Sequence, residues 1–458
     1  MALSTLQIAK TAILARQAEI DLISNNVANV NTVGYAKRRA VLSTIAGAQN
    51  STYSAIGQGV SLSAIQRLGD KLLDAQIDVE TGQLGQELTF ARSLAEIETI
   101  VGTSSGTGFT NALNKLFDSF SDLAADPSAD TPRHAVIAAG EALCDEVRQV
   151  REQLLSALSQ NDAQLTQLVA DVNSLAEQVA ALNRSVGAGG GPERAPDLAE
   201  QRANAVTELA RLAGAVSSTR PDGTVDVYIG GHLLVQGDLA LGLTTLPDGG
   251  SPPMMTVQFK GNTPPEALGG ELQGTLDARD RAIKPALGAL NGFVSDVADA
   301  INGLHSTGYA LDGTTTGLNL FTYTPGDEAG TFALSAPIVA DPSLIAAADA
   351  AGQPGNGGIA LALEALRTEP APGHTYSLMT EHSDYVATLG VQVASAEARA
   401  DARQTVVDTL ENRRQQLSGV SLDEEAVYLT EAQTAYNAAS RIVQIAIEMM
   451  DTILALGR

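Results

Sequence analysis

The sequence feature that most constrains the fold is a seven-residue repeat of apolar side chains near the end of the chain, in residues 420–457. Positions seven apart fall on one stripe of a helix, so this spacing predicts a long amphipathic helix. Such a helix is marginal on its own and needs a partner. The first row is Leu422, Leu429, Tyr436, Val443 and Met450; a companion row is Ala432, Ala439, Ala446 and Ile453; Tyr428, Ala435, Ile442, Met449 and Leu456 widen the face.

The partner is expected at the opposite end of the chain, in residues 2–30. The same spacing recurs there, in Leu6, Ile13, Ile20 and Val27. Two terminal helices with matching repeats predict a coiled coil that closes the molecule at one end. The spacing leaves open whether these rows form a core within one subunit or contact a neighbouring subunit. Both can hold, because a helix pair can present its outer face to the next subunit.

Polar residues mark the ends of both helices. Asn25, Asn26 and Asn29 precede a turn in which Gly34 can adopt a positive φ without steric cost. On spacing alone, we interpret these asparagines as amide caps of an ordinary helix C-terminus. At the other helix, Ser421 followed by Glu424 has the spacing of a capping box. The carboxylates of Asp423, Glu424 and Glu425 then fall in the first turn, where the helix dipole favours negative charge.

The terminal strings resemble those of a known family. SNNVANVNTVGYAKRR is similar to the N-terminal signature of bacterial flagellar rod, hook and hook-associated proteins, although Val33 stands where the family usually has Pro and Ala36 where it has Ser. The string SLDEEAVYLTEAQTAYNAASRIVQ resembles the C-terminus of hook-associated proteins, as do the internal strings DLAEQRANAVTELARLAG and DGTVDVYIGGHLLVQGD. The resemblance spans most of the chain except residues 306–385.

The resemblance implies a structural protein that polymerises at the hook tip and connects hook to filament. The partners it implies are further copies of the chain in a ring, the flagellar hook protein, the second hook–filament junction protein and a cytoplasmic export chaperone. It also implies export through the flagellar type III apparatus without a cleaved signal peptide, to an extracellular place in the flagellum. The alternatives are another flagellar axial protein, namely the hook protein or the second junction protein, or a secreted adhesin-like protein.

The same resemblance suggests that the amides and Tyr35 help the turn pack between subunits. The expected assembly interface is Leu6, Ile13, Ile20, Asn25, Asn26, Val27, Asn29, Thr32, Gly34, Tyr35, Leu422, Leu429, Tyr436, Val443, Met450 and Ile453.

The middle of the chain alternates between helix and strand signals. Residues 36–70 predict a β-hairpin or extended segment, and residues 133–186 predict a helix with a strict heptad seam. After a GAGGGP break, Asp197 and Glu200 are expected to cap a helix that ends near Ala213. Turn signals at Asp222-Gly223 and Gly230-Gly231 then predict hairpins.

This order predicts an α+β multidomain protein, with a long helical coiled-coil-like bundle formed by both chain termini and small β-rich domains inserted between them. The expected domains are a terminal helical assembly core at 1–70 with 420–458, a helical shaft at 71–214 with 275–305 and 386–419, a small β domain at 215–274, and an outer β-rich or irregular module at 306–385.

Composition excludes several functions. The formal charge of −25 over 458 residues argues against nucleic acid or an anionic membrane as a partner, although simple solubility explains the charge equally well. Cys144 is the single cysteine, so a disulfide framework is excluded and a buried structural thiol is expected. Lys10, Arg16 and Glu19 interrupt the apolar residues that a signal peptide would need. No apolar run is long enough to insert into a membrane.

Catalytic chemistry is not indicated. The five histidines are scattered, and none has zinc-type spacing to a second ligand. A metal site around His374 and His382 is a minor hypothesis. Asp277, Arg279, Asp280 and Arg281 are interpreted as a solvated helix face. We therefore predict no enzymatic activity, no cofactor, and no catalytic, cofactor-binding or metal-binding residues.

Overall fold

The computed structural model describes residues 2–32, 34–46, 57–102, 108–250, 253–261, 264–265 and 267–456. Val33 and the side chains of Ile453 and Leu456, which are all used in the sequence analysis, lie outside the described part. The chain divides into two compact units. The first comprises Met1–Gly85, Leu168–Leu272 and Ala402–Arg458, and the second comprises Gln86–Gln167 and Gln273–Asp401. The fold is mainly helical with small antiparallel sheets, which confirms the predicted α+β multidomain class.

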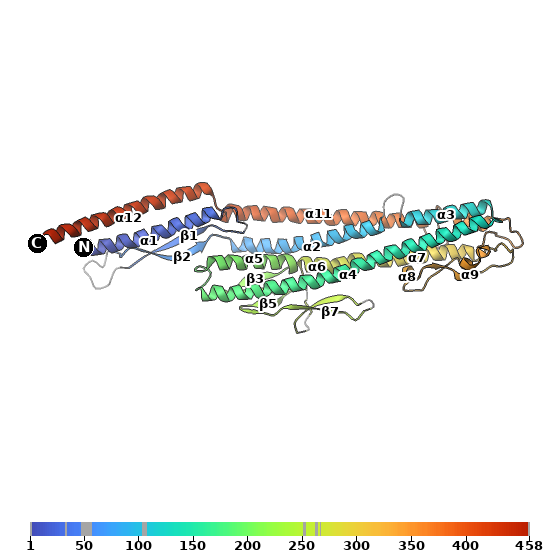
Figure 1. Ribbon diagram of the computed structural model, residues 1–458, viewed down its shortest axis with the longest axis horizontal. Helices are drawn as coiled ribbons and strands as arrows, with labels where there is room; N and C mark the ends of the chain where they lie inside the picture. The colour runs from blue at the N-terminus through green and yellow to red at the C-terminus, as the bar shows by residue number, and fades with distance from the viewer. Residues whose placement is uncertain are drawn as a thin grey trace. The chain divides into compact units, whose positions relative to one another are not determined.

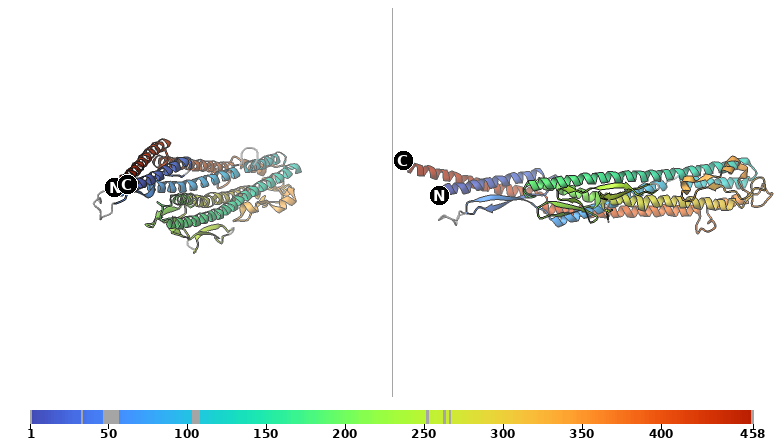
Figure 2. Two further views of the ribbon diagram at one scale, coloured as in Figure 1. Left: turned by 60° about the vertical axis from the view of Figure 1, so that its left-hand side comes forward. Right: turned by 90° about the horizontal axis from the view of Figure 1, so that it is seen from below.

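In the first unit, helix α1 (Ala2–Ala28) lies antiparallel along helix α12 (Leu422–Leu456), so that both chain ends lie at the same end of this pair (Figures 1 and 2). The predicted pairing of the terminal helices is therefore confirmed. The buried seam is made of small side chains, since Ala432, Ala439 and Ala446 of α12 and Ala9 and Ala15 of α1 are each at most 5% exposed. Alanines allow two helices to approach closely, so the companion row, rather than the row of larger residues, fills the centre of the contact.

A β-hairpin follows α1, as predicted for residues 36–70. Strands β1 (Arg38–Thr44) and β2 (Val60–Arg67) are antiparallel, and their register shifts between Val41 and Leu42. The backbone of Lys37, just before β1, donates to the Ser418 carbonyl oxygen at 2.8 Å and accepts from the Leu68 N–H at 3.0 Å. The hairpin is thereby tied at its base to the segment that precedes α12.

Helix α2 (Lys71–Val101) begins in the first unit and packs there against α5 (Pro196–Ala213). Gly82 and Gly85 weaken helical propensity in sequence terms, and the structure supplies the reason for them. A Cβ atom at Gly82 would lie 2.8 Å from the Ala210 carbonyl oxygen, and one at Gly85 would lie 2.6 Å from that of Arg211. Only glycine permits this approach of two backbones.

The predicted strands of residues 215–274 form two separate antiparallel sheets. One has the strand order β3-β4-β5-β6, and the other pairs β7 with β8. Both predicted turns are confirmed, because Asp222-Gly223 joins β3 to β4 and Gly230-Gly231 joins β4 to β5. The strands are β3 (Val216–Thr219), β4 (Val225–Ile229), β5 (His232–Gln236), β6 (Leu239–Ala240), β7 (Leu243–Pro247) and β8 (Met255–Phe259).

The second unit is built around a core that α3 (Phe109–Ala125) fills with five completely buried apolar side chains, each 0% exposed: Leu113, Leu116, Phe117, Phe120 and Leu123. Helices α4 (Asp130–Ala188) and α7 (Lys284–His305) contribute the facing residues. The seam predicted within 133–186 is confirmed as a buried row of α4, since Leu165 in this unit and Val172 and Val179 in the first unit are all 0% exposed.

Residues 306–385 do not form the β-rich module that was one of the expected alternatives. They are mostly irregular with short helices, and their strands β9 (Phe321–Thr322) and β10 (Ala333–Leu334) hold only two residues each. Phe321, Ile345 and Leu363 from this segment enter the same core as α3. The short helices are α8 (Glu328–Thr331), α9 (Ala336–Ala340), a 3₁₀ turn (Pro342–Leu344) and α10 (Gly358–Ala365). The long helix α11 (Leu378–Ser418) follows, and it begins before residue 386, where the shaft was expected to resume.

The interpretation of Asp277 to Arg281 as a solvated face is wrong for Arg279. Helix α6 (Gly270–Ala278) continues into α7 through a π-helical segment, Arg279–Ile283. Arg279, the first residue of this segment, is 7% exposed and pairs with Asp280 at 2.9 Å. The charge of Arg279 suggested a solvated position, and the ion pair with Asp280 is what allows the side chain to be buried.

A buried histidine makes the second unit sensitive to acid. His305 is 1% exposed, and its Nδ1 donates to the Leu318 carbonyl oxygen at 2.7 Å while its Nε2 accepts from the Ala346 N–H at 2.9 Å. The contact with Ala346 requires the neutral ring, because a proton on Nε2 would remove the acceptor. Burial lowers the pKa of His305 to about 4.

Stability is therefore expected to fall as the pH decreases. Because the folded-state pKa of His305, about 4, lies below the ordinary value of 6.5, the unfolded chain takes up this proton first. The contribution is fully present above pH 6.5 and is lost by about pH 4, for a total of about 3 kcal/mol. Chemical denaturation of the wild type and of His305→Gln, repeated from pH 6.5 to pH 4, measures this contribution to the free energy of unfolding. The wild type should lose about 3 kcal/mol more than the variant, and equal losses would contradict the assignment.

Candidate assembly site at the paired chain termini

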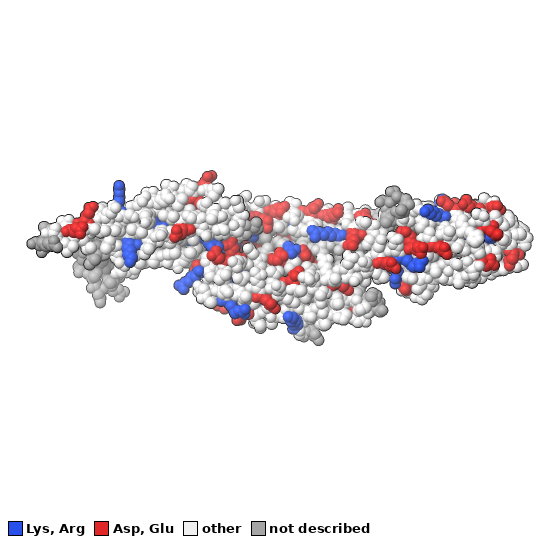
Figure 3. Space-filling view, viewed as in Figure 1, with Lys and Arg blue, Asp and Glu red and all other residues white. Residues whose placement is uncertain are grey.

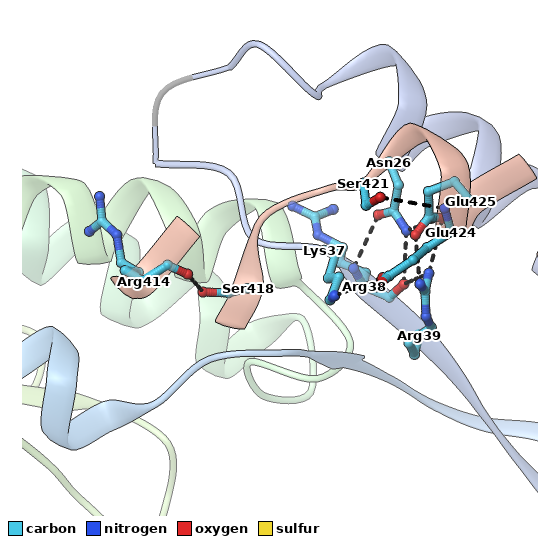
Figure 4. Close-up of polar contacts among 9 residues, drawn as sticks. All are labelled: Asn26, Lys37, Arg38, Arg39, Arg414, Ser418, Ser421, Glu424 and Glu425. Carbon is cyan, nitrogen blue, oxygen red and sulfur yellow. Dashed lines mark hydrogen bonds and ion pairs between the residues drawn. The ribbon is translucent and has the colours of Figure 1, made fainter. Parts of the chain in front are cut away.

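The end of α1 carries a completely buried asparagine that joins three elements of the first unit (Figure 4). Asn26 is 0% exposed. Its Nδ2 donates to the Arg38 carbonyl oxygen and to Glu425 Oε2, both at 3.0 Å, and its Oδ1 accepts from the Arg38 N–H at 3.1 Å and from the Tyr35 hydroxyl at 2.8 Å. The side chain thus uses both of its donors and both acceptor positions. It connects α1 to β1 and to the start of α12.

Glu425 of α12 is the charged partner in this cluster and is also 0% exposed. Arg39 holds it with two hydrogen bonds, from its two terminal nitrogens to Oε2 at 3.0 Å and to Oε1 at 2.6 Å. Burial alone would lower the pKa of Arg39, but the hydrogen bonds to Glu425 outweigh that effect and raise it. The guanidinium also stacks over the Tyr428 ring, 4.3 Å from its centroid. We refer to Asn26, Arg38, Arg39 and Glu425 as the terminal polar cluster.

Arg38 extends this cluster to α5. Its guanidinium donates to Asp197 at 2.5 Å and to Glu200 at 2.6 Å, and the side chain is only 6% exposed. The prediction that Asp197 and Glu200 cap α5 is therefore wrong: α5 forms as expected, but these two side chains do not cap it. The N-cap residue is Ala195, whose side chain makes no capping bond, and the carboxylates instead neutralise a buried arginine.

The turn after α1 is held by its own side chains. The Asn29 Nδ2 donates to the Asn25 carbonyl oxygen at 2.9 Å, which is the amide capping expected from the spacing. Thr32 donates to Asn29 Oδ1 at 3.1 Å, and the Tyr35 hydroxyl shares its one proton between Asn26 Oδ1 and Asn25 Oδ1, which lies 3.1 Å away. Gly34 adopts φ 82° as expected, and a Cβ there would also lie 2.8 Å from the Asn204 side chain of α5. Asn25, Asn29, Thr32, Gly34 and Tyr35 are thus brought together.

In the first turn of α12, the neighbouring carboxylates Glu424 and Glu425 have different surroundings and different partners. Ser421 Oγ accepts from the Glu424 N–H at 3.5 Å, a long version of the predicted cap. Glu424 is exposed and pairs with Lys37 at 3.2 Å. Glu425, by contrast, points into the terminal polar cluster, so interpreting it as a dipole-stabilising cap misses its partner. Sequence reasoning also missed Arg38 and Arg39, although both stand inside the AKRR string used for the resemblance.

The predicted apolar rows take different positions on the helix pair. Leu6, Ile13, Ile20, Leu429, Tyr436, Val443 and Met450 are half-buried at the edges of the seam. Val27 and Leu422 are exposed, at 39% and 53%. On the widening row, Tyr428, Ile442 and Met449 are each 43–45% exposed, and we call these three residues the apolar flank of α12. Few charges interrupt the face of α12 that is visible in Figure 3.

Outside this site, the described residues offer little reactive chemistry. Cys144 is buried, as predicted, and burial raises the pKa of its thiol to about 12. His382 packs between the rings of Phe109 and Phe293. His374 instead lies beside Asp296 and Glu381. Among the helices described, none combines the length with the apolar character that crossing a membrane would require.

Comparisons with known proteins agree with this arrangement. The family described as "Flagellar hook-associated protein FlgK helical domain" matches residues 94–321. "Flagella basal body rod protein" matches residues 6–35, and "Flagellar basal body rod FlgEFG protein C-terminal" matches residues 413–456. The two rod matches fall on the helices that form the terminal pair.

Individual relatives give the same result. The chain is 25% identical over 496 residues to flagellar hook-associated protein 1 of Bacillus subtilis (strain 168), covering 98% of this chain and 97% of that protein. It is 30% identical over 322 residues to the protein of that name in Salmonella typhimurium, covering 67% of this chain and 57% of the relative. In fold it is similar to the flagellar hook junction protein FlgK of Burkholderia pseudomallei, with a TM-score of 0.64 at 16% identity over 75% of this chain and 100% of that one.

Rod-type termini that pair with each other define the class, a structural axial protein of the bacterial flagellum. Within this class, the chain belongs to the flagellar hook-associated protein FlgK family, whose members are structural components of the junction between hook and filament. The resemblance drawn from the terminal strings is confirmed, and the alternatives of another axial protein or an adhesin-like protein are set aside. The chain accordingly works in the flagellum, in association with other axial components.

Proposed function

We propose that the chain polymerises as a ring at the tip of the hook and there forms the adaptor between hook and filament. Its neighbours are further copies of itself, the hook protein on one side and the second junction protein on the other. The observation that carries this proposal is the α1–α12 pair, whose seam closes within one chain while the apolar flank at Tyr428, Ile442 and Met449 remains 43–45% exposed. Burying such a flank against a neighbouring subunit would favour assembly.

The terminal polar cluster has a supporting role in this proposal. Asn26 and Glu425 are both 0% exposed, so a neighbouring subunit cannot contact them directly. They fix the angle at which α12 leaves the hairpin and thereby orient the flank. Direct contact falls instead to the exposed Asn25 and Thr32 and to the half-buried Tyr35, with the apolar rows of both helices.

A double substitution on the flank tests the proposal. Ile442→Glu with Met449→Glu places two charges where a subunit contact would bury them, and each desolvated charge costs several kcal/mol. We expect binding to hook–basal bodies stripped of filament to fall by at least about a hundredfold, scored by electron microscopy over a concentration series. The fold should be retained, because both side chains are already 43–45% exposed in the single chain.

The matched control is Gln433→Glu with Gln444→Glu, which adds the same charge to the same helix at exposed positions on a different face. This variant should bind like wild type. Equal binding by the flank variant would place the flank outside the assembly contact. These point variants are sharper than deletion of residues 420–458, because the deletion would also uncover the buried face of α1.

The remaining parts of the proposal concern the route to the flagellum. A cytoplasmic export chaperone covers the apolar face of α12 before assembly, since an exposed apolar helix favours aggregation. The chain leaves through the flagellar type III apparatus without a cleaved signal peptide and acts outside the cell. Residues 1–70 with 420–458 form the assembly core, residues 71–214 with 275–305 and 386–419 form the shaft, the small β domain is 215–274, and the outer module 306–385 packs on the shaft through the core that it shares with α3. The chain works without catalysis and without a cofactor.

A further inference from the structure

Three potential metal ligands converge in the second unit from separate segments of the chain. Asp296 comes from α7, His374 from the irregular segment before α11, and Glu381 from the first turn of α11. One ligand atom from each lies within 4.8 Å of the other two. All three side chains are half-buried, so they are partly shielded from water yet reachable.

The charges in this group are unbalanced. Both oxygens of Glu381 face His374 Nδ1, at 3.2 and 3.3 Å. Among the described residues, no lysine or arginine forms an ion pair with Asp296 or Glu381, so the imidazole is their one possible cationic partner. Burial, together with the nearby Glu381 and Asp299, raises the pKa of Asp296, against the opposing effect of His374. In the described part of the chain, two carboxylates and one imidazole thus converge with no lysine or arginine paired to the carboxylates.

We propose that Asp296, His374 and Glu381 bind one divalent transition-metal ion of the Zn²⁺ type. Imidazole nitrogen with two carboxylates favours Zn²⁺ over Mg²⁺ or Ca²⁺, which prefer all-oxygen sites. Ligands of a four-coordinate zinc lie about 3.4 Å apart, so atoms now within 4.8 Å need only small side-chain rotations. Asp296 and Glu381 also line a cavity of about 240 Å³, which leaves room for a metal-bound water.

The bound ion would act as a structural staple. It would fasten the segment that contains His374, which follows the irregular residues after α10, to α7 and α11. Such an ion stabilises the folded unit by mass action, because the three ligands are brought together only in the folded chain. The inference does not depend on the assembly proposal, and its test uses the full chain in solution.

Isothermal titration calorimetry of the metal-free full chain with ZnCl₂ tests the site. We expect one saturable site per chain, unaffected by millimolar Mg²⁺. Asp296→Asn and Glu381→Gln keep side-chain size, and His374→Asn replaces the imidazole with a smaller amide; each should weaken binding by at least about tenfold. His134→Ala is the matched control for adventitious surface binding, because His134 is exposed on α4; Asp384→Asn controls for loss of an exposed carboxylate one turn away from Glu381 on α11.

The controls should bind Zn²⁺ like wild type. Circular dichroism of each variant without metal confirms that weakened binding does not come from unfolding. Co²⁺ provides an independent readout, since a four-coordinate site gives intense visible absorption that the three ligand variants should lose. Absence of a saturable site in the wild type, or wild-type affinity in His374→Asn, would overturn the proposal and leave His374 and Glu381 as a simple ion pair.

Discussion

Replacing Glu425 by alanine is expected to destabilise the helix pair α1–α12 by about 3–4 kcal/mol. The carboxylate is 0% exposed and accepts three hydrogen bonds, two from Arg39 and one from Asn26. Its removal leaves a partly buried guanidinium without its counter-ion and an amide N–H without one of its acceptors. Breaking a buried pair from one side is costly for this reason, even where the intact pair contributes little net stability.

The adjacent residue provides the control. Glu424 has the same chemistry and also forms an ion pair, with Lys37, but its side chain is 54% exposed. Glu424→Ala should cost at most about 0.5 kcal/mol. Amide hydrogen exchange in α12 distinguishes the two, because about 3 kcal/mol corresponds to exchange that is faster by more than about a hundredfold. Similar exchange rates in the two variants would show that Glu425 does not hold α12 in place.

Periodicity was sufficient to predict the terminal helix pair, since a seven-residue repeat is a local property that any window of sequence displays. It did not predict which row lies at the centre. The spacing gives the row of Leu429 and Tyr436 and the alanine row the same period, so it does not rank them. The structure places Ala432 and Ala439 at the centre, because closely spaced helices leave no room for larger side chains.

The terminal polar cluster could not be predicted in the same way. Asn26 and Glu425 lie 399 positions apart, and a single sequence carries no signal that links them. Each had a satisfactory local explanation, as a helix C-cap and as a first-turn carboxylate. Glu200 likewise has the spacing of a helix cap, but its partner is the buried guanidinium of Arg38. Helix-capping patterns pair a polar side chain with the backbone next to it. They fail where a charged residue from a distant part of the sequence binds that side chain instead.

The secondary structure of residues 306–385 could not be predicted for a different reason. They bury side chains such as Phe321 and Leu363 without a regular period, because short helices and loops enter the core one residue at a time. The function, in turn, came from the resemblance of specific strings and not from spacing. An amphipathic stripe is equally compatible with an internal core and with a subunit contact, and the half-buried rows of α1 and α12 fit both.

Introducing a second carboxylate beside Glu425 should be the most damaging change at this site. In Asn26→Asp, the new carboxylate would replace an amide that lies 3.0 Å from Glu425 Oε2 and that donates to the Arg38 carbonyl oxygen. Two buried like charges then face each other and one carbonyl loses its donor, for an expected cost of about 4 kcal/mol at neutral pH. Urea denaturation of the full chain, with the amide exchange of α1 and α12, measures this loss.

The double variant Asn26→Asp with Glu425→Gln separates electrostatics from geometry. It exchanges the amide and the carboxylate between the two positions, so that a donor and an acceptor again face each other across the same 3.0 Å contact. If charge repulsion dominates, the double variant should recover at least half of the lost stability, although Glu425→Gln alone is destabilising. Additive losses would instead assign the role of Asn26 to its hydrogen bond with the Arg38 carbonyl, which no substitution at position 425 can restore. Recovery would therefore identify the cluster as a charge-specific link between the two ends of the chain.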